Sequence, residues 1–262
     1  MQNAGIAALG LDWRYLAFEV HPDNLRAAIE GAKQMKFVGV NLTVPHKLLA
    51  MGMVDALDDS AKIWGAVNTI RFEPCDGGEI RAVGFNTDAD AITRAIREDL
   101  GTELRGAKVV LLGAGGAGRV AALKLAAENV AELFLVNRTV SKAEALTAEI
   151  LTGHPKVSVK AAYPTGSVDL VLNATSLGLK KDDALPLDAK KFSLKQARAV
   201  YDMIYRPAET PLLKSAKAAG CRVANGLSML LFQGAKALEI WTGKPAPIDA
   251  MRAALEKNVY GS

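Results

Sequence analysis

The glycine-rich stretch GAGGAG at 113–118 is the segment whose residue types point most directly to chemistry. It lies between the apolar run KVVLLG, which predicts a strand, and an alanine-rich run, which predicts a helix. Glycines permit a tight turn and let backbone N–H groups approach a pyrophosphate at the positive end of a helix. Such loops also occur as plain turns, but the strand before and the helix after favour dinucleotide binding. The residues concerned are Gly113, Ala114, Gly115, Gly116, Ala117 and Gly118.

The end of the next predicted strand carries Asn137, Arg138 and Thr139. An NAD site ends this strand with Asp or Glu, whose carboxylate accepts hydrogen bonds from the ribose 2′-hydroxyl. A guanidinium at this place binds a 2′-phosphate through two parallel hydrogen bonds, and Lys142 adds a positive charge one turn later. The alternative is that Arg138 and Lys142 are solvated surface residues. The pattern favours NADP over NAD.

Lys47 is a candidate proton donor because of its place in the first turn of a helix predicted from Pro45. The helix macrodipole is positive there and disfavours a cation, so the position favours loss of the lysine's proton. The alternative is a solvent-facing lysine that tolerates a small penalty. Asp88, in FNTDADAI, is a candidate carboxylate, although Thr87 or Asp88 also suits a helix cap.

Gln233 places an amide on an otherwise apolar helical stripe that it shares with Met229 and Ala237. A buried amide needs hydrogen-bond partners, and the hydroxyl groups of a ligand would supply them. The alternative is a core glutamine bonded to a loop.

Composition narrows the classes of protein to consider. Half of the 262 residues are hydrophobic and 23% are charged, which indicates a globular protein long enough for two modest domains. The net charge of +4 is spread along the chain without a basic block, which argues against nucleic-acid binding. Cys75 and Cys221 have no metal-ligand spacing, and no apolar run is long enough to span a membrane. We expect a cytoplasmic protein that needs no metal.

Elements of two kinds must position these residues. The first part of the chain mixes helices and strands and contains a predicted hairpin, with strands at 66–73 and 79–87. The elements predicted before this hairpin are a helix at 2–10, a strand at 13–20, a helix at 23–33, a strand at 37–44 and a helix at 45–57. From about residue 88 apolar strands alternate with helices, which indicates a parallel sheet covered on both faces. Two helices, at 227–241 and 247–259, end the chain.

The sequence therefore predicts an α/β fold of two domains. Residues 1–87 and 227–262 would form a substrate-binding domain with a mixed sheet, rejoined by the last helices. Residues 88–226 would form a Rossmann-like, doubly wound NADP-binding domain.

With these motifs assembled, the chain resembles the NADP-dependent shikimate dehydrogenase family over essentially its whole length. The matching segments, in order, are NLTVPHK (41–47), GAVNT (65–69), FNTD (85–88), GAGGAGR (113–119), VNRT (136–139), NATS (173–176), YDMIY (201–205) and NGLSMLLFQ (225–233). Several unrelated short matches in one order are far more specific than any single match. The resemblance implies reduction of 3-dehydroshikimate to shikimate by NADPH, a step toward chorismate and the aromatic amino acids.

The resemblance also implies roles for particular residues. Lys47 and Asp88 would be the catalytic pair at the reacting oxygen. The hydroxyl groups and ring of the substrate would be held by Thr43, Lys47, Asn68, Asp88, Tyr205 and Gln233. The 2′-phosphate would contact Asn137, Arg138, Thr139 and Lys142, and the nicotinamide would contact Met203, Gly226 and Met229. Lys142 stands where the family often has arginine, so we expect its phosphate contact to be less directional.

The start of the sequence departs from the family pattern. In the family, a strand and an HSxSP-like motif precede the helix that corresponds to QNAGIAALGL, and the serines of that motif bind the substrate carboxylate. Here the sequence begins at Met1, just after that point. We expect a start assigned too late, or a truncated or altered protein. A quinate-type or other sibling substrate, and an inactive NADP-binding paralogue, stay open as alternatives, as do a monomer and a homodimer.

Overall fold

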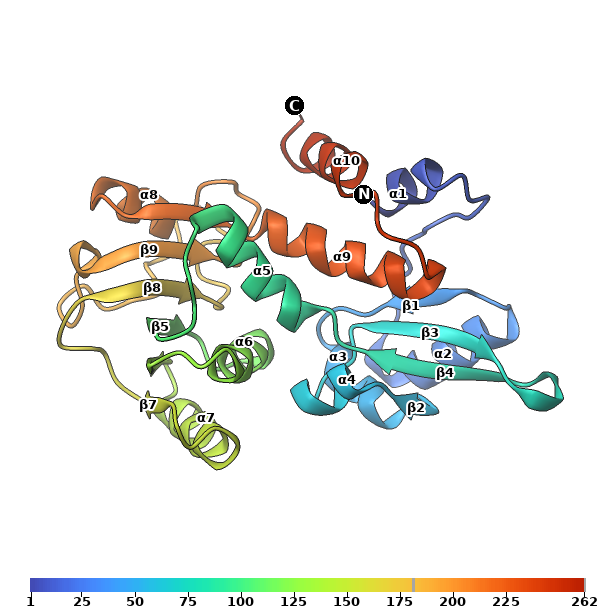
Figure 1. Ribbon diagram of the computed structural model, residues 1–262, viewed down its shortest axis with the longest axis horizontal. Helices are drawn as coiled ribbons and strands as arrows, with labels where there is room; N and C mark the ends of the chain where they lie inside the picture. Colours follow the sequence, from blue (N-terminus) through green and yellow to red (C-terminus); the bar gives the residue numbers. More distant parts are fainter. Residues whose placement is uncertain (181, 262) are drawn as a thin grey trace. The chain divides into compact units, whose positions relative to one another are not determined.

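A computed structural model describes residues 1–180 and 182–261 of the chain. The chain forms two compact units, which are drawn together in Figure 1. Unit 1 contains Met1–Asp88 and Leu231–Ser262, and unit 2 contains Ala89–Leu230. One mixed sheet and one parallel sheet are present, so the predicted α/β fold class is confirmed. Among the described helices, none has the length and apolar character needed to cross a membrane.

Unit 1 is built on a four-stranded mixed sheet in the order β1-β3-β4-β2. Its strands are β1 (Gly39–Asn41), β2 (Ala56–Leu57), β3 (Thr69–Pro74) and β4 (Ile80–Phe85). Strands β3 and β4 form the predicted antiparallel hairpin, in which Thr69 lies opposite Phe85. Strand β1 pairs antiparallel with the other edge of β3, and β2 pairs parallel with β4. The hairpin turn uses Gly77 and Gly78, both with a positive φ that favours glycine.

Unit 1 also contains helices. They are α1 (Gln2–Ala8), α2 (Leu25–Gln34), α3 (His46–Leu49), α4 (Asp59–Trp64), α9 (Leu227–Thr242) and α10 (Ile248–Tyr260). Leu25 and Ile29 of α2 share one buried apolar cluster with Ile70 and Phe72 of β3, which explains why one face of the hairpin is apolar. Short 3-10 turns occur at Pro22–Asn24, Ala50–Gly52, Asp76–Gly78 and Leu194–Gln196.

Two predictions for unit 1 are wrong. Residues 13–20 form no strand: the backbone N–H of Tyr15 donates to the side chain of Asn3 and not to a neighbouring strand. Alternating apolar residues favour a strand, but a strand exists only where a second backbone completes the ladder. The helix predicted over 45–57 ends at Leu49, and a 3-10 turn, β2 and α4 follow it.

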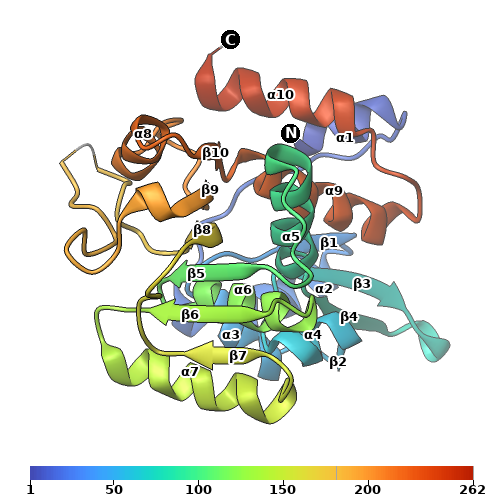
Figure 2. The same cartoon turned by 60° about the vertical axis from the view of Figure 1, so that its left-hand side comes forward.

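Unit 2 contains a six-stranded parallel sheet in the order β10-β9-β8-β5-β6-β7. Its strands are β5 (Lys108–Leu112), β6 (Glu132–Val136), β7 (Ser158–Lys160), β8 (Val168–Asn173), β9 (Ala197–Asp202) and β10 (Arg222–Asn225). Its helices are α5 (Asp88–Leu100), α6 (Gly116–Ala127), α7 (Val140–Gly153) and α8 (Pro211–Ala218). Figure 2 shows β5, β6 and β7 side by side, with α7 alongside β7.

The strand order of unit 2 reverses between β5 and β8. From β5 the chain proceeds outward through β6 and β7, and then returns to form β8 on the other side of β5. In open parallel sheets, ligands bind outside the carboxyl ends of the strands at such a switch point. The glycine-rich stretch 113–118 follows β5 directly and therefore lies at this point.

Candidate active site

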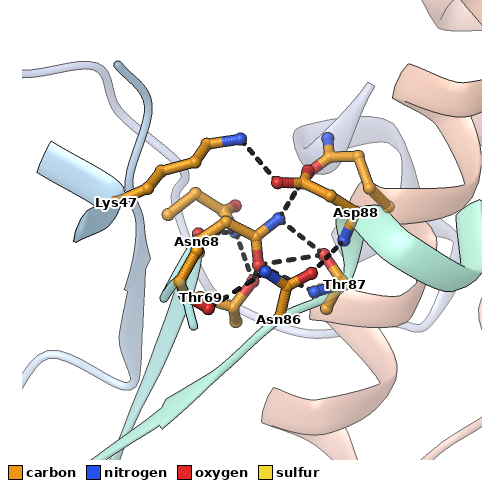
Figure 3. Close-up of polar contacts among 9 residues, drawn as sticks. Lys47, Asn68, Thr69, Asn86, Thr87 and Asp88 are labelled. Carbon is orange, nitrogen blue, oxygen red and sulfur yellow. Dashed lines mark hydrogen bonds and ion pairs between the residues drawn. The ribbon is translucent and has the colours of Figure 1, made fainter. Parts of the chain in front are cut away.

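Lys47 and Asp88 form an ion pair in unit 1, with 2.7 Å between Lys47 Nζ and Asp88 Oδ2 (Figure 3). The side chains are 27% and 11% exposed, so Lys47 is not the freely solvated lysine of the alternative interpretation. Lys47 comes from α3, and Asp88 begins α5, three residues after the end of the hairpin strand β4. A cation and a carboxylate in such contact, partly shielded from water, can exchange a proton with a bound ligand.

The dipole argument for Lys47 is not supported by the structure. Helix α3 is only four residues long, so Lys47 lies in its first turn and also in its last. The macrodipole of one turn is small. The Asp88 carboxylate lies 2.7 Å from the Lys47 ammonium nitrogen.

Asn68 is the centre of the hydrogen bonds around this pair (Figure 3). It is 1% exposed, and it lies directly before β3. Its Nδ2 donates to Asp88 Oδ1 at 2.9 Å and to Thr87 Oγ1 at 2.9 Å. Its Oδ1 accepts from the Thr87 backbone N–H at 2.8 Å and from the Thr69 hydroxyl at 3.1 Å. Both carboxylate oxygens of Asp88 thus receive a donor, one from Lys47 and one from Asn68.

The segment 86–88 holds Asp88 in place. The side chain of Asn86 accepts a hydrogen bond from the Asp88 backbone N–H at 3.1 Å and donates to the carbonyl of Ala66 at 3.0 Å. Asn86 and Thr87 are both buried. Sequence reasoning assigned no site role to Asn86 and considered Thr87 only as a cap; their signal was a run of polar residues directly after an apolar strand.

The remaining residues predicted to bind substrate differ in position. Gln233 of α9 is half-buried and meets the cluster, because Asn68 Nδ2 lies 3.5 Å from Gln233 Oε1. Thr43 is exposed in the turn before α3, where its carbonyl accepts from the backbone N–H of His46. Tyr205 belongs to unit 2 and is half-buried in the segment after β9. The structure therefore brings together Lys47, Asn68, Asp88 and Gln233.

The glycine-rich turn of unit 2 has the close packing that requires glycine. Gly113 has φ +104°, which L side chains rarely adopt. A Cβ on Gly118 would lie 2.1 Å from the carbonyl oxygen of Gly113, so a side chain there would force the turn open. Gly115 precedes α6 as its N-cap, and Gly116 is its first helical residue; both have open space around the Cα atom. Ala114 and Ala117 complete the stretch.

The residues predicted for the 2′-phosphate lie at the end of β6 and the start of α7. Asn137 Oδ1 accepts from the backbone N–H of Ala114 at 3.1 Å, and its Nδ2 donates to the carbonyl of Thr139 at 2.8 Å. Arg138, Thr139 and Lys142 are all exposed, with Thr139 as the N-cap of α7. Two exposed cations next to a helix start suit a phosphate group.

Met203, Gly226 and Met229, predicted to line a nicotinamide, all lie in unit 2. A Cβ on Gly226 would lie 2.0 Å from the carbonyl oxygen of Met203, which explains the glycine. The N–H of Gly226 donates to the carbonyl of Ile204 at 3.2 Å, and Met203 and Met229 are half-buried.

Sequence reasoning assigned no role to a buried polar cluster at the carboxyl ends of β8 and β9. Asp202, 0% exposed, accepts from Thr210 Oγ1 at 2.6 Å, Asn173 Nδ2 at 2.9 Å and the Ile204 N–H at 3.1 Å. Burial raises the pKa of Asp202, and these hydrogen bonds oppose that effect. A polar residue that ends each of two apolar strands was the available signal. The cluster joins the loops after both strands.

Three parts of the chain match known sequence families. Residues 1–70 match the shikimate dehydrogenase substrate binding domain. Residues 95–177 match the family described as shikimate / quinate 5-dehydrogenase, and residues 226–256 match the shikimate 5′-dehydrogenase C-terminal domain.

Individual proteins are similar over nearly the whole chain. The shikimate dehydrogenase (NADP(+)) of Methanopyrus kandleri is 40% identical over 265 residues, which cover 97% of this chain and 89% of that protein. A crystal structure of a shikimate dehydrogenase in complex with NADP+ is 38% identical, with a TM-score of 0.87, and covers 98% of this chain and 89% of its own. A crystal structure of ligand-free 5-ketofructose reductase of Gluconobacter sp. strain CHM43 is 35% identical, with a TM-score of 0.84. The match covers 98% of this chain and 92% of that protein's chain.

Proposed function

The chain belongs to the shikimate dehydrogenase family, and on that premise we propose that it catalyses the reversible reduction of 3-dehydroshikimate to shikimate by NADPH. It is thus an oxidoreductase that acts on a CH–OH group and serves the route to chorismate and the aromatic amino acids. The observation that carries this proposal is the Lys47–Asp88 ion pair, joined to the buried amide of Asn68.

Lys47 is the proton donor of the proposed reduction. When bound, the reduced nicotinamide supplies a hydride to the carbonyl carbon of the substrate, and negative charge develops on the oxygen. Lys47 gives a proton to that oxygen and takes it back in the oxidation direction. Asp88 holds the lysine ammonium through Oδ2 and orients the reacting oxygen beside it.

A substrate with several hydroxyl groups fits the cluster in unit 1. Asn68 and Gln233 present amide groups that both donate and accept, and Asp88 presents a carboxylate. We assign the substrate hydroxyls and ring to Thr43, Lys47, Asn68, Asp88, Tyr205 and Gln233. Thr43 and Tyr205 are assigned on the family resemblance alone.

NADP is the proposed cofactor, and the geometry of the glycine-rich turn in unit 2 suits a bound dinucleotide. The turn at 113–118 has no room for a Cβ on Gly118, and the helix α6 that begins at Gly116 offers free backbone N–H groups to a pyrophosphate. The 2′-phosphate is assigned to Asn137, Arg138, Thr139 and Lys142, and the nicotinamide to Met203, Gly226 and Met229. Of the four phosphate residues, Arg138 would contribute most because its guanidinium binds phosphate in a bidentate manner.

The two units are assigned separate tasks. We propose that unit 1 is the substrate-binding domain, expected from the sequence at 1–87 and 227–262, and that unit 2 is the NADP-binding domain, expected at 88–226. The bounds of the units differ from these at Asp88, which lies in unit 1, and at 227–230, which lie in unit 2. Both cysteines are free thiols, which suits a reducing compartment, and we place the enzyme in the cytoplasm. Whether it acts as a monomer or a homodimer is to be measured by sedimentation.

The test measures oxidation of NADPH with 3-dehydroshikimate, and reduction of NADP+ with shikimate, by the unmutated chain. Turnover with both supports the proposal. Quinate, 5-ketofructose and an amino analogue of shikimate serve as competing substrates. The panel includes 5-ketofructose because a 5-ketofructose reductase is similar to this chain, with a TM-score of 0.84. A preference for any of these would replace shikimate as the substrate, and NADPH binding without turnover would indicate an inactive paralogue.

A further inference from the structure

The hydrogen bonds around Asn68 continue away from Lys47 in a single chain that ends at Tyr15. The hydroxyl of Tyr15 donates to Asn41 Oδ1 at 3.0 Å. Asn41 Nδ2 donates to Thr69 Oγ1 at 3.0 Å, and the Thr69 hydroxyl donates to Asn68 Oδ1 at 3.1 Å. Asn68 Nδ2 then donates to Asp88 Oδ1 at 2.9 Å. Thr69, 0% exposed, is shown beside Asn68 in Figure 3.

Backbone groups determine the donor-to-acceptor direction of this series of hydrogen bonds at two points. Asn41 Nδ2 lies 3.2 Å from the backbone carbonyl of Asn68, which only accepts, so the nitrogen of the Asn41 amide must face this side. Asn68 Oδ1 lies 2.8 Å from the backbone N–H of Thr87, which only donates, so the oxygen of the Asn68 amide must face that side. The amide orientations follow from these contacts and not from a choice between equivalent atoms.

Thr69 completes the arrangement because a hydroxyl has one proton to donate. Thr69 Oγ1 accepts a hydrogen bond from Asn41 Nδ2, and its own proton is donated to Asn68 Oδ1. The register of the sheet makes this possible, since Asn41 of β1 lies directly opposite Thr69 of β3. Hydrogen bonds that run in one direction through a region partly shielded from water polarise and strengthen one another.

We propose that Thr69 is a positioning residue for the reaction: with Asn41 and Tyr15 behind it, it holds the Asn68 amide so that its NH₂ group faces Asp88. Asp88 Oδ1 is then occupied by Asn68, and Oδ2 faces Lys47. Without the Thr69 hydroxyl, one of the bonds that orient the Asn68 amide is lost, and Asp88 is held less firmly against Lys47. This inference rests on the proposed function for its kinetic consequence but not for its structural one.

Tyr15, the first donor in this series of hydrogen bonds, is itself held by several contacts. The backbone of Tyr15 makes two hydrogen bonds with the side chain of Asn3, at 2.7 and 3.0 Å. Its ring lies 6.1 Å from that of Trp241, whose indole N–H donates to the carbonyl of Ile70. Burial raises the pKa of the Tyr15 hydroxyl, a group that is protonated at neutral pH in any case and can therefore donate to Asn41.

The kinetic test compares Thr69→Val, which removes the hydroxyl at similar size, with Thr69→Ser, which keeps it. The valine variant should fold, because Asn41 Nδ2 keeps the Asn68 carbonyl and Asn68 Oδ1 keeps the Thr87 N–H. We expect kcat to fall about tenfold, the factor for one ordinary hydrogen bond, with the Kd of NADPH unchanged. Thr69→Ser should restore kcat to within about threefold of the unmutated value, by the same scale.

A matched control is Thr242→Val, because the Thr242 hydroxyl donates to the Leu238 carbonyl within α9 and serves only local backbone groups. This variant should keep the unmutated kcat. The proposal is overturned if Thr69→Val also keeps it. It is overturned equally if the valine and serine variants lose kcat, cofactor affinity and melting temperature together, since that pattern marks a purely structural residue.

A measurement without substrate separates this inference from the proposed function. The side-chain NH₂ resonances of Asn68 are identified in ¹⁵N-labelled protein by their loss in Asn68→Asp. In Thr69→Val, and less strongly in Tyr15→Phe, we expect these protons to shift and to exchange with solvent several-fold faster. If the unmutated chain shows no turnover, the proposed function fails while this readout still decides the role of Thr69. Unchanged Asn68 resonances in both variants would refute it.

Discussion

The backbone N–H of Ala114 donates to the side-chain oxygen of Asn137 across 3.1 Å. This bond fastens the glycine-rich turn after β5 to the end of β6, 23 positions later in the chain. The amide nitrogen of Asn137 in turn donates to the carbonyl of Thr139. Arg138 lies between these two anchored residues in the sequence, and it is exposed. The cofactor preference can be tested at this residue.

Replacing Arg138 with alanine should remove most of the preference for NADPH over NADH. A guanidinium makes charge-assisted hydrogen bonds to a 2′-phosphate, and losing such contacts costs about 1.5–3 kcal/mol. NADH lacks this phosphate, so its affinity should be nearly unchanged. The measurement is the Kd of each cofactor by fluorescence titration. Arg105→Ala, an exposed arginine before the amino end of β5, is the control. Equal Kd values for the two cofactors in the unmutated protein would contradict the assignment.

Replacing Lys47 with alanine should lower kcat by about 10²–10⁴-fold, the usual contribution of a general acid. The loss should appear in kcat because the lysine acts on charge that develops in the transition state. NADPH affinity should stay unchanged. Lys33→Ala is the matched control, since Lys33 makes an ion pair of the same 2.7 Å length with Asp55, elsewhere in unit 1. A Lys47→Ala enzyme that keeps most of its turnover would require another proton donor.

Replacing Gly118 with alanine should weaken NADPH binding. The new Cβ would lie 2.1 Å from the Gly113 carbonyl oxygen, so the turn must shift. Overpacking of this kind costs about 1–3 kcal/mol, which should appear in both cofactor affinity and melting temperature. Gly153→Ala, at the end of α7 with no atom within 4 Å of the added Cβ, should leave NADPH affinity unchanged. Equal cofactor affinity of the two variants would show that the turn tolerates a side chain.

Glu128 at the end of α6 should make the stability of unit 2 depend on pH. Burial by itself raises the pKa of Glu128, but the hydrogen bonds and charges of Lys124 and Arg97 outweigh burial and bring the pKa below its usual 4.5. A carboxylate with a lowered pKa stabilises the fold above its unfolded pKa. That contribution is lost as the pH falls through the folded pKa.

Glu128→Gln should therefore lower the free energy of unfolding near neutral pH by about 1.5–3 kcal/mol, the range for hydrogen bonds to charged groups. The difference from the unmutated protein should shrink as the pH falls below 4.5. Urea unfolding across this pH range measures it. The control is Glu209→Gln, whose ion pair with Lys217 has side chains 44% and 68% exposed and should contribute little. A pH-independent difference for Glu128→Gln would show that the carboxylate charge is not the cause.

Unit 2 was largely predictable from the sequence because its signals are local. The run 108–142 contains, in order, an apolar strand, the glycine-rich turn, a helix, a second strand and the cations that follow it. The inner strands β5, β6, β8 and β9 are mostly buried and therefore mostly apolar, which marks them clearly. The polar ends of β8 and β9 were missed as a cluster because Asn173 and Asp202 are 29 positions apart and meet only through the sheet register.

Unit 1 was less predictable because its sheet and its site both depend on distant partners. The apolar alternation of residues 13–20 indicated a strand, but no ladder forms there, and Tyr15 instead bonds to Asn3 and Asn41. Pairing in a sheet depends on a second backbone that a local pattern does not contain. The helix from Pro45 ended early for the same reason, since β2 after it pairs with β4.

By itself, the sequence determined the α/β class, the place of the glycine-rich turn and of the cations after the next strand, and the residue types available for acid–base chemistry. Only the tertiary structure decided that Lys47, Asn68, Asp88 and Gln233 form one cluster, because they come from four places in the chain. The tertiary structure also decided the orientation of the Asn41 and Asn68 amides and the hydrogen bonds that join Asn41 to Thr69 and Thr69 to Asn68. Hydrogen bonds act over about 3 Å, so their partners are defined by packing in space and not by separation along the chain.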